Sequence, residues 1–175
     1  MKIIKTKLKD LLIYKKPTYK DKRGFLREMF IKKYINKNFV FDIISYSKKN
    51  VLRGLHIQTK NSQGKLISVI KGKVFDVGVD CRKNSKTFGK YFSTILTEKN
   101  STSIYIPEGF AHGFLALENS IVHYKCTQFR EINFETGIMW NDKDLDIKWP
   151  KKNYIISDKD KSNSDFKQFE KIKLI

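Results

Sequence analysis

The sequence predicts a mainly β protein, a sandwich or barrel with a few short peripheral helices. Short runs rich in β-branched and aromatic residues recur at a roughly ten-residue spacing, which is typical of antiparallel sheets. Clusters of Gly, Pro, Asn and Ser separate these runs and mark turns. Segments with helical periodicity are few and short, so we expect the strands to form the core.

The longest expected strand region covers residues 66–80, and Lys71-Gly72-Lys73 interrupts it as a turn or bulge signal. Further strands are expected at 91–96, 103–106, 113–117 and 121–127, each bounded by turn residues such as Pro107-Glu108-Gly109. The segments 31–36 and 165–172 are the candidate helices.

The length of 175 residues fits a single domain over 1–175, in which the polar, Lys-rich segment 161–175 is expected to be a loose tail. Contents of 40% hydrophobic and 13% aromatic residues indicate a folded globular chain. The apolar runs are too short to span a bilayer, and the first residues lack the apolar stretch of a signal peptide. We therefore expect a cytoplasmic protein with two free thiols, Cys81 and Cys126.

The net charge of +18 raises the question of a nucleic-acid partner. The basic residues are 31 lysines and only 5 arginines, and they are spread along the whole chain. Proteins that read bases or phosphates usually gather basic and aromatic residues on one element. The pattern therefore favours a solvated basic surface, with no nucleic-acid or membrane partner, whose field attracts small anions such as a nucleotide diphosphate.

Two of the three histidines lie in short glycine-framed segments bounded by β-rich sequence. His56 ends Arg53-Gly54-Leu55-His56, and His112 lies in Pro107-Glu108-Gly109-Phe110-Ala111-His112-Gly113-Phe114. Histidine is the side chain most easily tuned to move protons near neutral pH. Taken alone, each could equally be an ordinary packed residue; a sheet that brings them together would make a proton-transfer site.

A series of motifs between residues 21 and 161 resembles the dTDP-4-dehydrorhamnose 3,5-epimerase family, in family order. The motifs are Arg53-Gly54-Leu55-His56-x-Gln58, Gly64-Lys65-Leu66-Ile67, Gly72-Lys73-Val74-Phe75-Asp76-Val77, Val79-Asp80-x-Arg82, Phe88-Gly89-Lys90, the His112 segment, Tyr124-Lys125-Cys126-Thr127, Gly137-Ile138-x-Trp140-Asn141-Asp142, Ile147-x-Trp149-Pro150 and Ser157-x-Lys159-Asp160. The resemblance implies a cupin-type jelly roll that forms a homodimer, in which the early Arg-Gly segment reaches a neighbouring active site. It also implies a cofactor-free epimerase that inverts C3, C5 or both in a nucleotide-linked 4-keto-6-deoxy sugar.

That reaction needs a base, a group that stabilises the enolate oxygen, and an acid on the far face of the sugar. The resemblance assigns His56 as the base, Asp160 as its partner, Lys65 to the oxyanion and Tyr124 as the acid. Without it, Asp160 would be a solvated charge, Lys65 a surface lysine and Tyr124 a core aromatic. Strand alternation turns His123 away from the face that Tyr124 occupies, so His123 is given no catalytic role.

The resemblance also suggests contacts with the substrate. Guanidinium groups suit phosphate oxygens, which makes the arginines candidate diphosphate contacts. The expected binding residues are Arg23, Glu28, Arg53, His112 and Lys161.

Pro107-x-Gly109-x-x-His112 is similar to the second half-motif of metal-binding cupins. The first half-motif is incomplete, because Gln58 follows His56-Ile57 where a histidine would be needed. Two histidines without a third strong ligand make a poor metal site, so we predict no metal and no cofactor.

The chain departs from the family where the nucleotide and sugar are contacted. A Gln-x-Asn element is replaced by Phe41-Asp42-Ile43, and Leu26 stands where an aromatic residue is expected. A site without those amides cannot make the same polar contacts. We therefore expect a different nucleotide or a modified sugar, processed by an intact set of proton-transfer residues.

Two other functions remain open at the level of the sequence. One is a metal-dependent cupin oxygenase that uses His56 and His112 as ligands; the other is a non-catalytic module that binds sugar nucleotides. Metal content separates the first from an epimerase, and proton exchange separates the second.

Overall fold

The computed structural model describes residues 1–150 and 153–172. Its strands are β1 (Lys2–Lys5), β2 (Leu12–Lys15), β3 (Thr18–Asp21), β4 (Gly24–Arg27), β5 (Phe41–Ser47), β6 (Leu52–Gln58), β7 (Lys65–Lys71), β8 (Lys73–Asp80), β9 (Tyr91–Thr97), β10 (Thr102–Ile106), β11 (Phe110–Ala116), β12 (Ser120–Cys126) and β13 (Glu135–Gly137). The short helices are η1 (Ile132–Phe134), α1 (Asp158–Lys161) and α2 (Phe166–Phe169).

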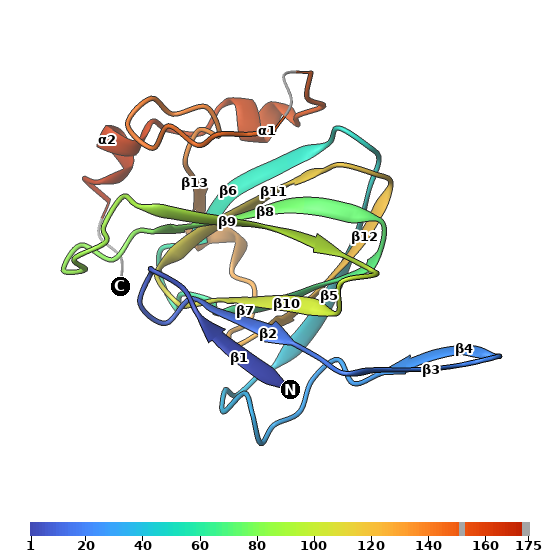
Figure 1. The fold of residues 1–175 in the computed structure, drawn as a ribbon. Coiled ribbons are helices and arrows are strands. Elements are labelled where there is room, and N and C mark those ends of the chain that lie inside the picture. Colours follow the sequence, from blue (N-terminus) through green and yellow to red (C-terminus); the bar gives the residue numbers. More distant parts are fainter. Residues whose placement is uncertain (151–152, 173–175) are drawn as a thin grey trace.

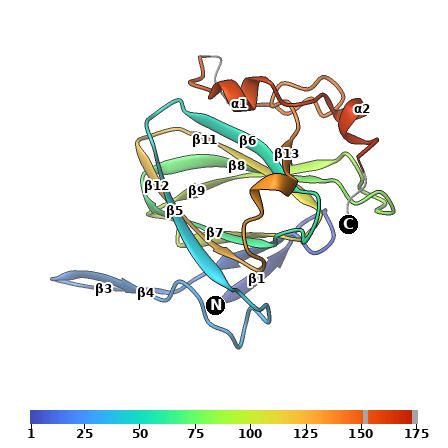
Figure 2. The same ribbon diagram turned by 180° about the vertical axis from the view of Figure 1, so that it is seen from behind.

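In the described residues, eleven of these strands form two facing antiparallel sheets, seen from two sides in Figures 1 and 2, and β3 and β4 form a separate two-stranded sheet. The six-stranded sheet has the order β1-β2-β10-β7-β12-β5, and the five-stranded sheet has the order β13-β6-β11-β8-β9. Gly72, with φ +80°, lies between β7 and β8 and passes the chain from one sheet to the other. This is a jelly-roll arrangement, as the sequence predicted.

Apolar side chains of both sheets meet in the main core, which includes Ile67, Val69, Ile104, Phe114 and Val122. A second core covers the outer side of the five-stranded sheet, where Phe166 and Phe169 of α2 pack with Leu55 and Val77. The five-stranded sheet thus has a core on each of its two faces. Its interior strand β11 is therefore buried along its whole length.

The hairpin of β3 and β4 projects from the barrel and pairs with no other strand (Figures 1 and 2). Its side chains Tyr19, Phe25 and Leu26 are 59%, 63% and 64% exposed. The outer face of the six-stranded sheet also exposes apolar side chains, among them Ile44 and Tyr46 of β5. Neighbouring exposed apolar side chains make these two regions candidate contact surfaces.

The expected strands are confirmed, and β7 and β8 divide at Gly72 as the turn signal indicated. The expected helix at 31–36 is wrong: Ile35 N–H bonds the Ile31 carbonyl at 3.2 Å, but the turn is not continued. The helix expected at 165–172 is present only over Phe166–Phe169, with Asp165 as its N-cap. The described part of the expected tail is anchored by Phe166 and Phe169, while residues 173–175 lie outside the described residues.

Among the described residues no helix is long and apolar enough to cross a membrane.

Candidate active site

A pocket of about 220 Å³ lies between the two sheets and gathers most of the residues that the sequence singled out. The five-stranded sheet contributes Arg53 and His56 from β6 and His112 from β11. The six-stranded sheet contributes Lys65 from β7 and Tyr124 from β12. A ligand in this pocket therefore has titratable groups on two opposite sides.

His56 is bonded to a buried carboxylate: its Nε2 lies 2.6 Å from Asp160 Oδ1. The Asp160 side chain is 5% exposed, whereas the His56 side chain keeps 40% of its surface and faces the pocket. The other carboxylate oxygen accepts the Gly54 N–H at 3.1 Å, and the Ser157 hydroxyl caps the helix by accepting the Asp160 N–H. This frame fixes the carboxylate, which holds Nε2 protonated and leaves Nδ1 as the basic nitrogen.

Burial by itself raises the pKa of Asp160, but it is outweighed by the hydrogen bond and charge of His56 and by the Gly54 amide. The net effect lowers the pKa, so Asp160 is ionised at neutral pH. An ionised carboxylate can stabilise the imidazolium that forms when His56 takes a proton.

The second histidine lies beside the first on the adjacent strand of the same sheet, since His112 and His56 are partners in the β6–β11 ladder. His112 Nε2 lies 2.9 Å from Asp76 Oδ2, and both side chains are buried. The strands approach closely here: a Cβ on Gly54 would lie 2.6 Å from the Gly113 Cα, and Gly54 has φ +113°. Glycine is therefore required at position 54, which explains its place in the Arg53-Gly54-Leu55-His56 motif.

Lys65 begins β7 and faces the pocket beside Cys126, its partner across to β12. Desolvation lowers the pKa of Lys65, and the nearby Cys126 and Glu135 oppose that effect. An ammonium in this dry environment is placed to stabilise negative charge that develops on a ligand.

Tyr124 comes from the sheet that faces His56, and its hydroxyl lies 3.2 Å from the Ser45 hydroxyl. Burial is the main cause that raises its pKa, so the phenol is protonated at neutral pH. His123 points to the opposite face of β12, where its Nε2 lies 3.1 Å from Asp42. The alternation expected from the sequence therefore holds in the structure.

Arg53 lies at the edge of the pocket, where its Nε donates to the Ser47 hydroxyl at 3.0 Å. Three other expected binding residues do not line the pocket of their own chain. Arg23 lies in the projecting hairpin and pairs with Asp21 at 2.6 Å, Glu28 follows that hairpin, and Lys161 is exposed and pairs with Asp158 at 2.9 Å.

The sequence interpretation gave no role to several residues in the pocket or in contact with it. Asp76 does not line the pocket but positions His112; in the sequence it is a carboxylate within an apolar strand. Arg130 donates two hydrogen bonds to Glu135, at 2.6 and 3.0 Å, and this pairing lowers the pKa of Glu135 to about 2. Further lining residues that were given no role include Ser45, Gln63 and Phe114.

Within the described parts of the chain, His, Cys, Asp and Glu side chains form no group of three or more that could hold a metal ion. Each pocket histidine directs Nε2 to one carboxylate. The absence of a metal remains a prediction.

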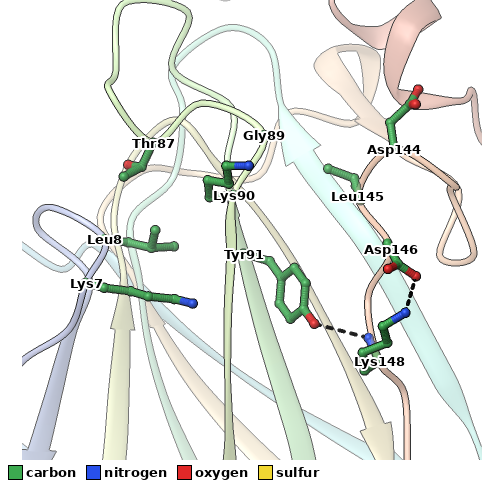
Figure 3. Close-up of a pocket in the computed structure, with 10 residues that line it drawn as sticks. All are labelled: Lys7, Leu8, Thr87, Gly89, Lys90, Tyr91, Asp144, Leu145, Asp146 and Lys148. Atoms are coloured by element: carbon green, nitrogen blue, oxygen red, sulfur yellow. Dashed lines mark hydrogen bonds and ion pairs between the residues drawn. The ribbon is translucent and has the colours of Figure 1, made fainter.

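A larger cavity of about 600 Å³ lies elsewhere, between the β1–β2 connection, the start of β9 and residues 144–148 (Figure 3). Its lining includes Lys7, Lys90 and Tyr91, whose hydroxyl accepts the Lys148 N–H at 3.2 Å. It contains no histidine and none of the expected site residues. The side chains that line the two cavities therefore favour the smaller pocket, which contains His56 and His112, as the active site, although the other cavity is larger.

The fold and the pocket define a cupin-type jelly roll with titratable side chains gathered between its sheets. The family model of dTDP-4-dehydrorhamnose 3,5-epimerase matches residues 5–168. The chain is 44% identical over 170 residues to the dTDP-4-dehydrorhamnose 3,5-epimerase of Methanothermobacter thermautotrophicus, covering 92% of each chain. The chain thus belongs to the dTDP-4-dehydrorhamnose 3,5-epimerase family, and is an isomerase that acts on carbohydrates.

Solved structures show the same relationship. The crystal structure of dTDP-4-dehydrorhamnose 3,5-epimerase from Elizabethkingia anophelis is 40% identical, with a TM-score of 0.91 over 96% of this chain and 97% of that one. The dTDP-6-deoxy-D-glucose-3,5-epimerase from Legionella pneumophila, in complex with dTDP-4-keto-L-rhamnose, is 40% identical with a TM-score of 0.90, over 94% of this chain and 92% of that one. These comparisons favour an epimerase over the oxygenase and binding-module alternatives.

Proposed function

We propose that the pocket binds a nucleotide-linked 4-keto-6-deoxy sugar and inverts C3, C5 or both, without a cofactor. The observation that carries the proposal is the hydrogen bond between His56 and Asp160. The Asp160 carboxylate is buried, while the His56 imidazole is open to the pocket. A base of this kind is what removal of a proton next to a ketone requires.

In the proposed reaction, His56 Nδ1 removes the proton from the carbon beside the C4 ketone. The electron pair moves into an enolate, and the C4 oxyanion is stabilised by the ammonium of Lys65. Tyr124 then donates its hydroxyl proton to the same carbon from the opposite sheet, so the new C–H bond forms on the other face of the ring. The Tyr124 phenolate and the His56 imidazolium return to their starting states by proton exchange with solvent.

His112 is proposed to contact the sugar beside His56, with Asp76 as its positioning residue. Arg53 is proposed to contact the diphosphate, because its guanidinium lies at the exposed edge of the pocket.

We propose further that the protein is a homodimer in which the β3–β4 hairpin of one copy completes the pocket of the other. The hairpin projects from its own barrel with Tyr19, Phe25 and Leu26 exposed. This arrangement gives Arg23 and Glu28 a place at a pocket, although neither lines the pocket of its own chain.

Deuterium exchange tests the reaction. The protein is incubated in D2O with dTDP-4-keto-6-deoxyglucose and related 4-keto sugar nucleotides, and NMR follows deuterium at C3 and C5. His56→Ala should abolish incorporation, whereas His123→Ala, on the outer face of β12, should retain it. Tight binding with no exchange from any of these substrates would defeat the proposal.

Subunit mixing tests the shared site. The His56→Ala variant is expected to be inactive and the Arg23→Ala variant weakly active, but a heterodimer of the two should carry one intact site and regain activity. Failure to regain activity in heterodimers, or a monomeric mass in sedimentation, would rule out the shared pocket.

A further inference from the structure

Two neighbouring cavities lie apart from the histidine pocket. One is the cavity of about 600 Å³ in Figure 3, and the other has a volume of about 620 Å³. Lys7 and Thr87 line both, so the two cavities adjoin, and we call them together the basic groove. The groove shares no lining residue with the pocket that contains His56 and His112. A ligand in the groove would therefore leave the candidate active site open.

The walls of the second cavity are two connections between strands. They are residues 6–11, between β1 and β2, and residues 81–90, between β8 and β9. The Arg82 guanidinium ties one connection to the other, because it donates to the Asp10 carboxylate at 3.0 Å and to the Lys9 carbonyl at 3.1 Å. Walls that are already joined cost less conformational entropy to order when a ligand binds.

A buried carboxylate holds the second of these walls in place without neutralising the groove. Asp80 is fully buried and accepts two hydrogen bonds from Arg82, at 2.9 Å each. It also accepts the hydroxyls of Ser85 and Thr87, at 2.6 and 2.7 Å. Burial raises the pKa of Asp80, but these hydrogen bonds outweigh burial and the net effect lowers the pKa. Asp80 is therefore ionised, and Arg82 balances its charge.

The lysines of the groove have no such partner. Those that form no ion pair within the part of the chain that the structure describes are Lys7, Lys9, Lys86 and Lys90. The first cavity also contains Asp144 and Asp146, but each of these is paired with another lysine. The described lining of the second cavity includes no carboxylate. Cations gathered in a concave surface focus a positive field that attracts anions.

We propose that the basic groove binds an anion that carries a chain of two or more phosphate groups, at a site separate from the epimerase pocket. Lysine ammonium groups bind phosphate oxygens as point charges. Four unpaired lysines on two fixed walls match several phosphate charges in a row, whereas a single carboxylate would leave most of them uncompensated. Inorganic tripolyphosphate and ATP present the same phosphate chain, so both serve as probes.

Calorimetry tests the site without sugar nucleotide or turnover, and its outcome is independent of the reaction assigned to His56. The Arg53→Ala protein is used, so that the diphosphate contact proposed for the epimerase pocket is removed. At about 150 mM salt, tripolyphosphate or ATP should bind with a Kd below about 0.1 mM. Equal affinities would assign the ligand to the phosphate chain alone, and tighter binding of ATP would assign it to a nucleotide. Weaker binding of both probes than this Kd would overturn the proposal.

Variants separate the groove from the general positive charge of the protein. Lys7→Gln combined with Lys86→Gln should weaken binding of tripolyphosphate by roughly tenfold or more. The matched control is Lys71→Gln combined with Lys99→Gln, which removes the same charge from exposed lysines outside both cavities. Equal weakening in the two double variants would overturn the proposal, because attraction by net charge alone would then explain the binding.

NMR locates the bound anion. Titration of the Arg53→Ala protein with tripolyphosphate should shift the amide signals of residues 6–11 and 81–90 together, with one binding curve. The amide signals of His56 and His112 should stay in place. Shifts centred on these two histidines, or spread over lysines along the whole chain, would overturn the proposal.

Discussion

The substitution Asp160→Asn removes a negative charge beside the His56 ring and keeps the size of the side chain. Nε2 and Oδ1 are 2.6 Å apart, which places the two charge centres about 4 Å apart when His56 is protonated. At an effective dielectric constant of about 20 the attraction is about 4 kcal/mol. Because the His56 side chain is 40% exposed, water screens part of it, and we take about 3 kcal/mol.

A loss of about 3 kcal/mol from the stabilisation of the imidazolium corresponds to a fall in kcat of roughly a hundredfold. The asparagine amide can also donate to Nε2 and hold the wrong tautomer, which would reduce the rate further. The assay is the initial rate of deuterium incorporation at saturating substrate, with the melting temperature recorded in parallel.

Asp158→Asn is the control, because Asp158 belongs to the same short helix and its side chain is 98% exposed. It should keep the wild-type rate. The reasoning fails if Asp160→Asn stays within about fivefold of wild type, or if Asp158→Asn loses as much activity.

Three further predictions concern other residues. Tyr124→Phe should still exchange the substrate proton for deuterium but should form the inverted product roughly a hundredfold more slowly, as NMR of the product shows; unimpaired inversion would exclude Tyr124 as the acid. Lys65→Met should lower kcat by roughly a hundredfold or more, whereas Lys71→Met, on the same strand, should not; equal rates for the two variants would contradict the oxyanion role. The pKa of Lys16 is lowered from 10.5 to about 8, mainly by burial and further by the charge of Arg27. Between these pH values the unfolded chain binds more protons than the folded one. The free energy of unfolding should therefore rise with pH in this range, by about 3 kcal/mol. Urea unfolding should show that rise in the wild type and not in Lys16→Met; identical pH profiles would refute it.

The strands were predictable because their residues alternate or are uniformly apolar, and because Gly and Asn mark their ends. The segment 31–36 was not, since its helical pattern is one turn long and Ile35 is held by packing with Tyr14 and Tyr105 instead. Periodicity also could not show that Gly72 joins two different sheets, because partner choice depends on contacts far apart in sequence.

For the site, the motifs that resemble the family singled out His56, Lys65 and Tyr124, and the structure brings these three side chains to one pocket. It did not identify Asp76, whose contact with His112 depends on the neighbouring strand. Arg23 and Glu28 illustrate the opposite case, because their motif is clear while neither lines the pocket between the sheets of its own chain.

The pairing of His56 with His112 across β6 and β11 has a consequence for how the protein can diverge. Both imidazoles belong to interior strands whose neighbours lock them on either side, whereas Phe41 belongs to β5 at the margin of its sheet and Phe129 to a connecting segment. Changes at the margin disturb few neighbours, so the apolar side chains there can vary by substitution. The two histidines proposed to lie against the substrate are meanwhile held in register by the ladder.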